Sequence, residues 1–367
     1  MRIAYTCQDI SVHGGLERII ADKASAMAAR GHDVCLIVNC PPGSTCAYAL
    51  HPRVGVFDIS LPGPSGLLST LRFKWRQNMR ILKALRRFRP DITVAVPTWL
   101  TLGMFMAPGR LVLESHDYRP LTFVSEKSSR YKRFKAAVAE LLASAVVTLT
   151  LEDKALWPAA GRVELIPNFS NISHPAQSTG RREGDAVAMV RLAPQKQIDL
   201  LIDAWAEVTR RHPHATLDIY GDGPQREWLQ QRIEALALDG CVRLRGCTSD
   251  ATAEYASHGF LVLSSMHEGF GLVLIEAMAC GCPCVAVDCP AGPREIIDHG
   301  RDGLLVPYRG LTREQQMRNL ADAICSMLDN PERTAEMGRR ARTSVARFDK
   351  DAIMSRWEKL FKDLCRK

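Results

Sequence analysis

The sequence has 367 residues, of which 46% are hydrophobic, and a formal net charge of +8 at pH 7. A chain of this length exceeds the size at which one core keeps growing, so two ordered domains are predicted and a disordered chain is excluded. The N-terminus resembles no signal peptide and no apolar run reaches about 18 residues, which predicts a protein that is neither secreted nor membrane-spanning. Twelve cysteines in such a chain indicate reduced thiols in the cytoplasm.

The charge is unevenly distributed. Residues 1–172 carry 22 Lys and Arg against 13 Asp and Glu, whereas residues 173–367 carry 26 against 27. The first half therefore contributes the basic excess. This asymmetry predicts that one domain faces something anionic, which leaves open nucleic acid, a phosphorylated ligand or lipid headgroups.

The first 40 residues have the pattern of one βαβ unit. An apolar run at 3–5 is followed by a glycine pair, by apolar residues at helical spacing from 16 to 28, and by a second apolar run at 34–38. Arg30-Gly31 marks the end of the helix between them. The same alternation of apolar runs and helix-ending residues recurs downstream and predicts a parallel sheet covered by helices. The further strands of this half are expected at 92–96, 111–113 and 146–149.

The alternation begins again after a loop rich in Ser, Pro and Asn, which we interpret as a linker at about 170–182. The second half therefore predicts another doubly wound α/β domain. The chain then closes with an amphipathic helix whose apolar stripe, Ile353, Trp357, Leu360, Phe361 and Leu364, predicts packing against a domain. The expected strands of this half lie at 187–190, 217–220, 242–244, 260–263 and 284–287.

A glycine-rich turn, Glu268-Gly-Phe-Gly-Leu, follows the expected strand at 260–263. The helix that begins near Leu272 leaves the backbone NH groups of Phe270, Gly271 and Leu272 free to face a diphosphate. Glu268, just before this helix, is placed to reach a sugar beyond the phosphates, and Glu276, one turn into it, suits a bidentate grip on a ribose diol. The alternative is that both glutamates are solvated acids at a helix start, where acids are common.

Other turns also carry candidate residues. Arg191 and Lys196, after the first strand of the second half, suit a leaving diphosphate, although solvated loop charges give the same pattern. Gly14 and Gly15 allow close approach of phosphate or sugar, or simply form a tight turn. His116 ends a strand of the first half and is either catalytic or structural.

The motifs HGGLER, ARGHDV, IPN, VRLAPQK, GDGP and EGFGLVLIE, taken in this order, resemble the retaining nucleotide-sugar glycosyltransferases of family 4. Each motif is weak alone, but the series covers almost the whole chain. The resemblance implies the GT-B fold, in which two Rossmann-like doubly wound domains face each other across a cleft. It assigns residues 1–172 to the acceptor and 173–349 to the donor, and implies that the terminal helix, 350–367, crosses back to complete the N-terminal domain.

The resemblance also implies roles for single residues. Glu268 and Glu276 match paired glutamates that contact the transferred sugar and the ribose, respectively. Arg191 and Lys196 match the pair that neutralises the donor diphosphate, and His116 matches a histidine that approaches the donor sugar from the acceptor domain. In the front-face mechanism proposed for the family, the leaving phosphate accepts the proton of the acceptor. The remaining donor-binding positions are Gly14, Gly15, Phe270, Gly271 and Leu272.

Four clustered cysteines, Cys280, Cys282, Cys284 and Cys289, raise the possibility of zinc. A Cys-x-Cys-x-Cys series that runs from a helix end into a buried strand lacks the paired spacing of structural zinc sites, so we expect buried free thiols. The sequence Asp349-Lys-Asp resembles a metal-binding pair, but its place at a helix start is better explained by capping. We therefore expect neither a metal nor a cofactor.

Three other functions compete with this interpretation. A dinucleotide-dependent oxidoreductase is disfavoured because Leu274 replaces the third glycine of the fingerprint and no first βαβ unit surrounds the motif. A nucleotide-sugar epimerase or hydrolase on the same fold would have a similar donor site, and product analysis with and without an acceptor would separate these activities. A non-catalytic lipid- or nucleic-acid-binding protein would leave the paired glutamates and the Arg191/Lys196 pair unexplained.

Residues 69–90 contain eight Lys and Arg and no acid. Leu71, Trp75, Met79 and Leu82 are expected on one helical face, and a second basic run follows at 127–135. We predict that this half docks a cytoplasmic enzyme on the anionic inner face of the membrane, that the acceptor is a saccharide linked to polyprenyl diphosphate, and that nucleic acid is not a partner. The alternative is a domain helix with solvated charges. The cations of the expected stripe are Arg72, Arg76, Arg80, Lys83 and Arg87.

Overall fold

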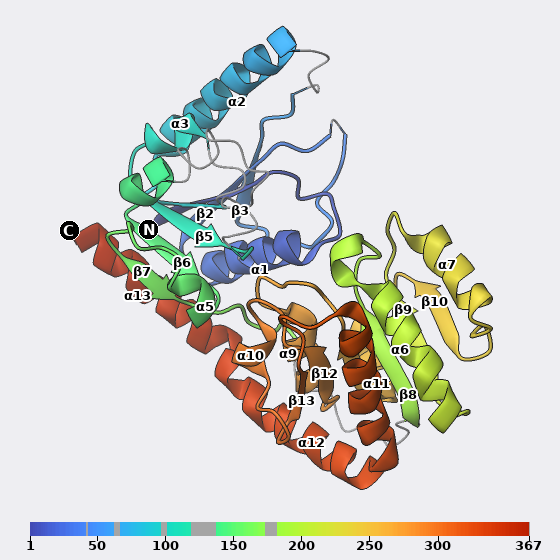
Figure 1. Ribbon diagram of the computed structural model, residues 1–367. Helices are drawn as coiled ribbons and strands as arrows, with labels where there is room; N and C mark the ends of the chain where they lie inside the picture. Colours follow the sequence, from blue (N-terminus) through green and yellow to red (C-terminus); the bar gives the residue numbers. More distant parts are fainter. Residues whose placement is uncertain (42, 62–66, 97–100, 119–136, 173–181, 367) are drawn as a thin grey trace. The chain divides into compact units, whose positions relative to one another are not determined.

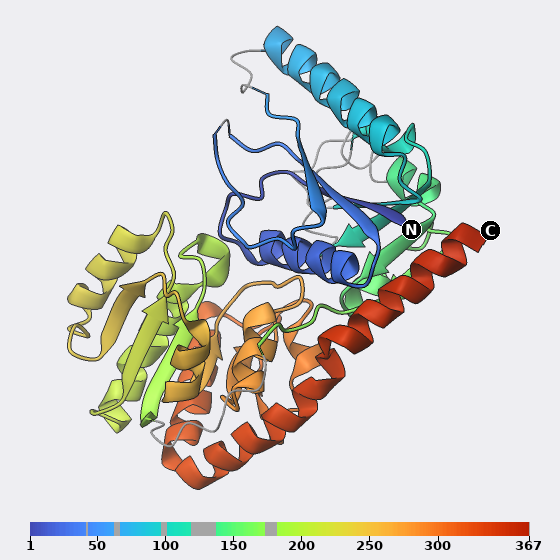
Figure 2. The same ribbon diagram turned by 180° about the vertical axis from the view of Figure 1, so that it is seen from behind.

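The computed structural model describes residues 1–367 except 42, 62–66, 97–100, 119–136, 173–181 and 367. The chain divides into two compact units (Figures 1 and 2). Unit 1 consists of Met1–Asn168 and Asp351–Lys367, and unit 2 is Phe169–Lys350. The first boundary falls just before the expected linker.

Unit 1 is built on a parallel sheet. Within the described residues its strands run in the order β3-β2-β1-β4-β5-β6-β7, and every neighbouring pair is parallel. Strands covered on both faces need apolar residues throughout, and β1, β2, β4 and β5 are buried along almost their whole length. The strands are β1 (Arg2–Cys7), β2 (Asp33–Val38), β3 (Val54–Asp58), β4 (Ile92–Ala95), β5 (Arg110–Ser115), β6 (Ala145–Thr148) and β7 (Val163–Leu165).

Helix α1 (Gly15–Ala29) shows how the sequence forms this unit. Its residues at helical spacing, including Ile20, Ala24 and Met27, are buried, and the helix packs on β1 and β2. Gly31 ends it with φ of 90°, a left-handed conformation that costs glycine little. Further helices of unit 1 in the described residues are α2 (Leu67–Phe88), α3 (Leu102–Phe105), α5 (Leu151–Lys154) and α13 (Lys350–Arg366).

Unit 2 repeats the design with a second parallel sheet. Its strands run in the order β10-β9-β8-β11-β12-β13 within the part of the chain described. Trp205, Phe260 and Val285 belong to the apolar core that joins this sheet to its helices. The strands are β8 (Arg182–Met189), β9 (Thr216–Tyr220), β10 (Val242–Gly246), β11 (His258–Leu263), β12 (Cys284–Val287) and β13 (Gly303–Val306).

The helices of unit 2 alternate with these strands as the sequence predicts. The longest, α11, begins with a complete capping box in which the Thr312 hydroxyl accepts from the backbone NH of Gln315. The α-helices are α6 (Ile198–Arg211), α7 (Arg226–Ala235), α8 (Ala251–Ser257), α9 (Leu272–Ala279), α10 (Pro293–Ile296), α11 (Arg313–Asp329) and α12 (Pro331–Ser344), and the 3₁₀ turns are η3 (Pro194–Lys196) and η4 (Val345–Phe348).

Helix α13 belongs to unit 1 although unit 2 precedes it in the chain. Its predicted apolar stripe is buried, and Trp357 is fully enclosed. Ion pairs fix the polar edges of this helix. Glu358 pairs with Arg30, the C-cap of α1, at 3.1 Å, and Asp363 pairs with Arg162, just before β7, at 3.4 Å. Figures 1 and 2 show α13 in red alongside the strands of unit 1. The prediction of two doubly wound α/β domains, with a terminal helix that returns to the first, is confirmed.

The basic segment forms helix α2, whose two halves differ. Toward its C-terminus Leu82, Leu85 and Phe88 enter the core, whereas Trp75 is 64% exposed and Met79 is 46% exposed. Of the expected apolar face, Leu82 is therefore buried in the core, and Trp75 and Met79 in the first half of the helix are exposed. The Leu71 side chain and the run at 127–135 lie outside the described residues. Among those described, no helix is both long and apolar enough to cross a bilayer.

Candidate functional site

The carboxyl ends of β8 and β11 form the switch point of the unit 2 sheet. Chain order reverses there, since β8 pairs with β9 on one side and with β11 on the other. Loops that leave adjacent strands in opposite directions open a crevice at this edge, which is where ligands bind in doubly wound sheets. Arg191 and Lys196 follow β8, and Glu268 follows β11. The topology therefore brings together residues that are more than 70 positions apart in the sequence.

Lys196 and Glu268 form an ion pair at this edge. The Lys196 ammonium donates to Glu268 Oε1 at 2.7 Å, and the two side chains are 22% and 10% exposed. Two further contacts fix the loops that carry them: the Ser264 hydroxyl donates to the Lys196 carbonyl at 2.9 Å, and the Met266 NH donates to the Gln195 carbonyl at 2.8 Å. A cation and an anion are thus held next to each other with little solvent around them.

Helix α9 begins beside this pair. Gly271 is its N-cap with φ of 97°, a left-handed conformation that disfavours other residues. The Phe270 side chain is buried and packs on Phe348 with ring centroids 5.4 Å apart, so only its backbone is available to a ligand. The first amides of a helix have no partner within it, which makes Phe270, Gly271 and Leu272 donors suited to an anion.

The loop after β12 supports the same turn. Gly292 has φ of 95°, and a Cβ added there would lie 2.3 Å from the Phe270 carbonyl oxygen and 3.2 Å from Glu268 Cβ. Glycine is required at this position by both its conformation and the close approach of the neighbouring backbone. Its contact with the Glu268 turn was not predicted, and the only signal in the sequence is a Gly-Pro pair after a buried strand.

Glu276 lies one turn into α9, where it is 4% exposed. The hydroxyl of Tyr255, from α8, donates to Glu276 Oε2 at 3.3 Å. This contact orients one carboxylate oxygen, and Tyr255 is a second residue that the sequence did not reveal. The interaction depends on the packing of α8 against α9, and no local sequence motif predicts that packing.

Arg191 is exposed and extends from a rigid turn. The GDGP segment packs on its backbone: the Leu192 NH donates to the Asp222 carbonyl at 3.0 Å, and a Cβ on Gly223 would lie 2.4 Å from the Leu192 carbonyl oxygen. The GDGP glycines therefore bring two backbones together, and Arg191, like Lys196, follows the carboxyl end of β8.

The remaining predicted residues lie in unit 1. Gly14 is the extended N-cap of α1, and its carbonyl accepts from the Tyr48 hydroxyl at 3.1 Å, while Gly15 opens the helix. His116 follows β5, with a side chain only 6% exposed, and its Nε2 lies 3.2 Å from Glu114 Oε1. The predicted residues that follow the strands of each sheet thus lie together in the unit that contains that sheet.

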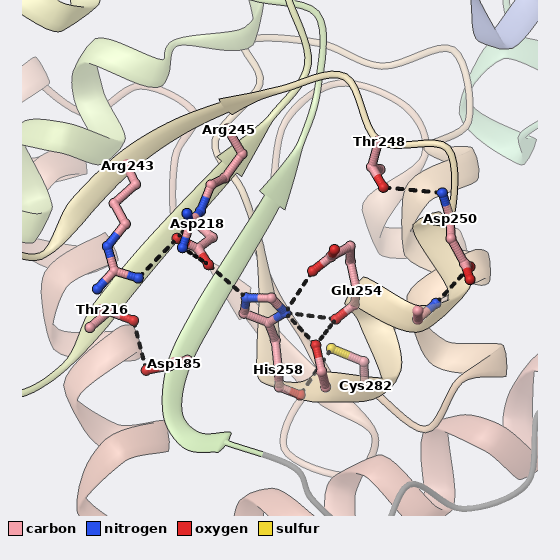
Figure 3. Close-up of polar contacts among 12 residues, drawn as sticks. Asp185, Thr216, Asp218, Arg243, Arg245, Thr248, Asp250, Glu254, His258 and Cys282 are labelled. Atoms are coloured by element: carbon pink, nitrogen blue, oxygen red, sulfur yellow. Dashed lines mark hydrogen bonds and ion pairs between the residues drawn. The ribbon is translucent and has the colours of Figure 1, made fainter.

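A second polar network in unit 2 joins β9, β10, α8 and β11 (Figure 3). Asp218 is 1% exposed and accepts from Arg245 at 2.9 and 3.2 Å, while His258 Nε2 lies 3.3 Å from it. Burial raises the pKa of Asp218, but the hydrogen bonds from His258 and Arg245 outweigh burial and lower the pKa to about 2. Because both carboxylate oxygens of Asp218 have partners, we interpret it as a structural anion that holds the edge strand β10 to the sheet.

The clustered cysteines are free and buried. Burial raises the pKa of the Cys284 thiol, and burial together with Glu268 raises that of Cys289, so neither supplies a thiolate near neutral pH. Among the described residues no group of three His, Cys, Asp or Glu side chains is arranged to hold a metal ion.

Comparison with solved structures places this fold among known ones. Anabaena HepE in complex with UDP-glucose superimposes with a TM-score of 0.76 at 22% identity, covering 99% of this chain and all of that one. A mutant of Staphylococcus aureus TarM, in complex with fondaparinux, α-GlcNAc-glycerol and UDP, gives a TM-score of 0.67 at 23% identity over 77% of this chain and 58% of TarM. At these identities the likeness concerns the fold.

Two family models match the chain in succession. The one described as Glycosyltransferase Family 4 matches residues 13–174, and the one described as Glycosyl transferases group 1 matches residues 184–330. Both halves of the chain are therefore similar to glycosyltransferase families, and the fold is GT-B. The second match contains the Lys196–Glu268 pair and the whole of α9, so the site built above lies in the group 1 half.

A sequence relative of this GT-B chain is the exopolysaccharide phosphotransferase SCO2592 of Streptomyces coelicolor. It is 32% identical over 310 residues, which make up 82% of this chain but only 32% of the relative. The chain thus spans about a third of that protein's length.

Proposed function

We propose that this chain is a retaining glycosyltransferase that moves a hexose or N-acetylhexosamine from a UDP-sugar to a lipid-linked saccharide in the assembly of a cell-surface polysaccharide. The observation that carries the proposal is the Lys196–Glu268 pair, 2.7 Å apart at the switch point, with Arg191 on the same sheet edge and the N-terminus of α9 beside it. Cations and free amides suit a diphosphate, and a carboxylate beside them suits sugar hydroxyls.

The chemistry follows from where charge develops. When the bond between the anomeric carbon and the phosphate oxygen breaks, its electron pair leaves with the diphosphate. Arg191, Lys196 and the first amides of α9 then face a growing negative charge, so they stabilise the transition state more than the ground state. The acceptor oxygen bonds to the anomeric carbon from the same face, and its proton passes to the departing phosphate. No protein nucleophile is required.

The assignment of the donor rests on the site and on the comparisons. Glu276, held by Tyr255 at 3.3 Å, presents a carboxylate suited to a ribose diol. HepE was solved with UDP-glucose and TarM with UDP, which supports a uridine nucleotide for this fold. Glu268 is then the residue that contacts the transferred sugar, and we assign His116 of unit 1 a catalytic role.

Purified protein incubated with UDP-sugars, with and without a polyprenyl-diphosphate saccharide, tests the proposal. Arg191→Ala and Lys196→Ala should each lower turnover by about two to three orders of magnitude, the scale for loss of one preorganised charge stabiliser. Glu276→Ala should chiefly weaken donor binding. Arg210→Ala, an exposed arginine on α6, is the matched control and should leave turnover unchanged. Full activity of the Arg191→Ala, Lys196→Ala double variant would refute the assignment, and product formed equally without acceptor would favour a hydrolase or epimerase.

The exposed half of α2 supports a membrane-docked acceptor domain. Trp75 and Met79 are 64% and 46% exposed, and the neighbouring Arg72, Lys74 and Arg76 are exposed as well. Aromatic and apolar side chains beside cations are the composition that enters an anionic lipid interface. In both views the N-terminal half of α2 projects from the rest of unit 1 (Figures 1 and 2).

Sedimentation with liposomes tests the docking. At about 1 kcal/mol per cation near an anionic surface, the three cations around Trp75 should give measurable, salt-sensitive binding to phosphatidylglycerol vesicles and little to phosphatidylcholine. Trp75→Ser combined with Arg72→Gln and Arg76→Gln should abolish it, whereas Arg339→Gln with Arg340→Gln, on exposed residues of α12, should not. Equal absence from both pellets at low salt would favour a soluble acceptor.

A further inference from the structure

A buried polar cluster lies directly beneath His116 in unit 1. It joins Lys23 of α1, Glu114 of β5 and Asn168 after β7, which are 0%, 1% and 3% exposed. The Lys23 ammonium donates to Glu114 Oε1 and, at 3.1 Å, to Asn168 Oδ1. It also lies 5.0 Å from the ring centroid of Trp357 in α13. Helix α1, the end of β5, the segment after β7 and the returning helix α13 thus meet at one fully buried ammonium.

Glu114 is ionised in this cluster. Burial raises the pKa of Glu114, but Lys23 and then His116 outweigh burial and bring it down to about 2. Glu114 is therefore a carboxylate at any physiological pH, and an ionised carboxylate only accepts hydrogen bonds. Its Oε1 is the oxygen that faces both Lys23 and His116.

The same oxygen sets the orientation of His116. Nε2 of His116 lies 3.2 Å from Glu114 Oε1, so the carboxylate favours a proton on that nitrogen. Nδ1 is then the nitrogen directed away from the carboxylate. The turn that follows is held separately, because the Ser115 hydroxyl donates to the Asp117 carbonyl at 3.1 Å.

We propose that Lys23 and Glu114 are positioning residues that hold the His116 ring with Nε2 toward Glu114 and Nδ1 away from it, in the orientation that the proposed transfer uses. The inference rests on the proposed glycosyl transfer, to which it adds two residues that touch no substrate. Energetics favour a functional reason for the pair: a buried ion pair is often no more stable than apolar residues of the same volume. Stability alone therefore gives no reason for a charged pair at this position.

The variant Lys23→Met, Glu114→Leu removes both charges at nearly constant volume, so it should fold. We expect kcat to fall by about 10- to 100-fold, the scale of a misplaced reacting group, with the KM for the UDP-sugar little changed. In a His116→Ala background the same double change should add no further loss, because it acts only through His116. Arg162→Met with Asp363→Leu removes a second charged contact of α13 in unit 1 and should leave kcat unchanged.

A readout without turnover separates this inference from the proposed function. Modification of His116 by diethyl pyrocarbonate, followed by peptide mass spectrometry, should be faster in the Lys23→Met, Glu114→Leu variant than in the wild type, because the ring is no longer fixed. If the wild type transfers no sugar, the proposed function fails and the modification rate still decides the positioning. The inference would be overturned by a folded double variant that has wild-type kcat or an unchanged rate of His116 modification. It would also be overturned if the loss of kcat in the double variant adds to that of His116→Ala.

Discussion

Substitution of Lys23 alone should change how the free energy of unfolding of unit 1 depends on pH. In the wild type the pKa of Glu114 is about 2 instead of its ordinary 4.5, although burial acts to raise it. At about 1.4 kcal/mol per pKa unit, this shift corresponds to roughly 3 kcal/mol of stability near neutral pH. Because the pKa is depressed in the folded state, that stability is present above 4.5 and is lost as the pH falls toward 2.

In Lys23→Met the carboxylate keeps its burial but loses its main partner. Breaking a buried pair in this way costs about 3–5 kcal/mol. Only His116 then opposes burial, so the pKa of Glu114 rises and the folded variant binds the proton more tightly than the folded wild type. The variant should therefore gain stability relative to the wild type as the pH is lowered from neutral.

Urea unfolding followed by hydrogen exchange in β1 and β5 reports unit 1 separately from unit 2. Lys83→Met, at an exposed position of α2, is the control for loss of a lysine charge. The reasoning is refuted if Lys23→Met destabilises unit 1 by less than about 1 kcal/mol relative to that control. It is equally refuted if the difference from the wild type does not shrink with falling pH.

Three further changes test single contacts. Tyr255→Phe removes the 3.3 Å bond to Glu276 and should weaken UDP binding in calorimetry; unchanged affinity would mean that Glu276 needs no such partner. Gly292→Ala places a Cβ 2.3 Å from the Phe270 carbonyl and should cost about 1–3 kcal/mol in thermal unfolding, together with donor affinity, and a variant of wild-type stability would argue against this close approach. Trp357→Ala should lower the free energy of unfolding of unit 1 by about 3–5 kcal/mol in urea, and an effect confined to unit 2 would contradict the placement of α13.

Much of the fold was predictable because buried parallel strands are continuous apolar runs, as in β1, β2 and β12. The edge strand β3 was missed because all its residues are half-buried or exposed and it contains Gly55. The three residues of β7 are all half-buried and give no stronger signal. Edge strands need fewer apolar residues, so their sequences resemble loops.

The candidate site shows the same division. Lys196 and Glu268 were predictable because each follows a recognisable strand within a motif, and the switch-point topology brings them together. Tyr255 and Gly292 were not, because their contacts depend on packing between α8 and α9 and between two loops. The Lys23–Glu114 pair was hidden for a related reason, since a lysine within a helical repeat resembles a solvent-exposed residue until the sheet beneath it is known.

The return of α13 to unit 1 also has a consequence for biosynthesis. A ribosome releases β1 to β7 long before it releases Trp357, Leu360 and Phe361, which cover part of that sheet. Unit 2 is synthesised in between and contains every strand of its own sheet. The second unit can thus complete its fold while the first still exposes an apolar surface. Nascent chains stalled before α13 should therefore depend on chaperones at unit 1 and be cleaved there first by proteases.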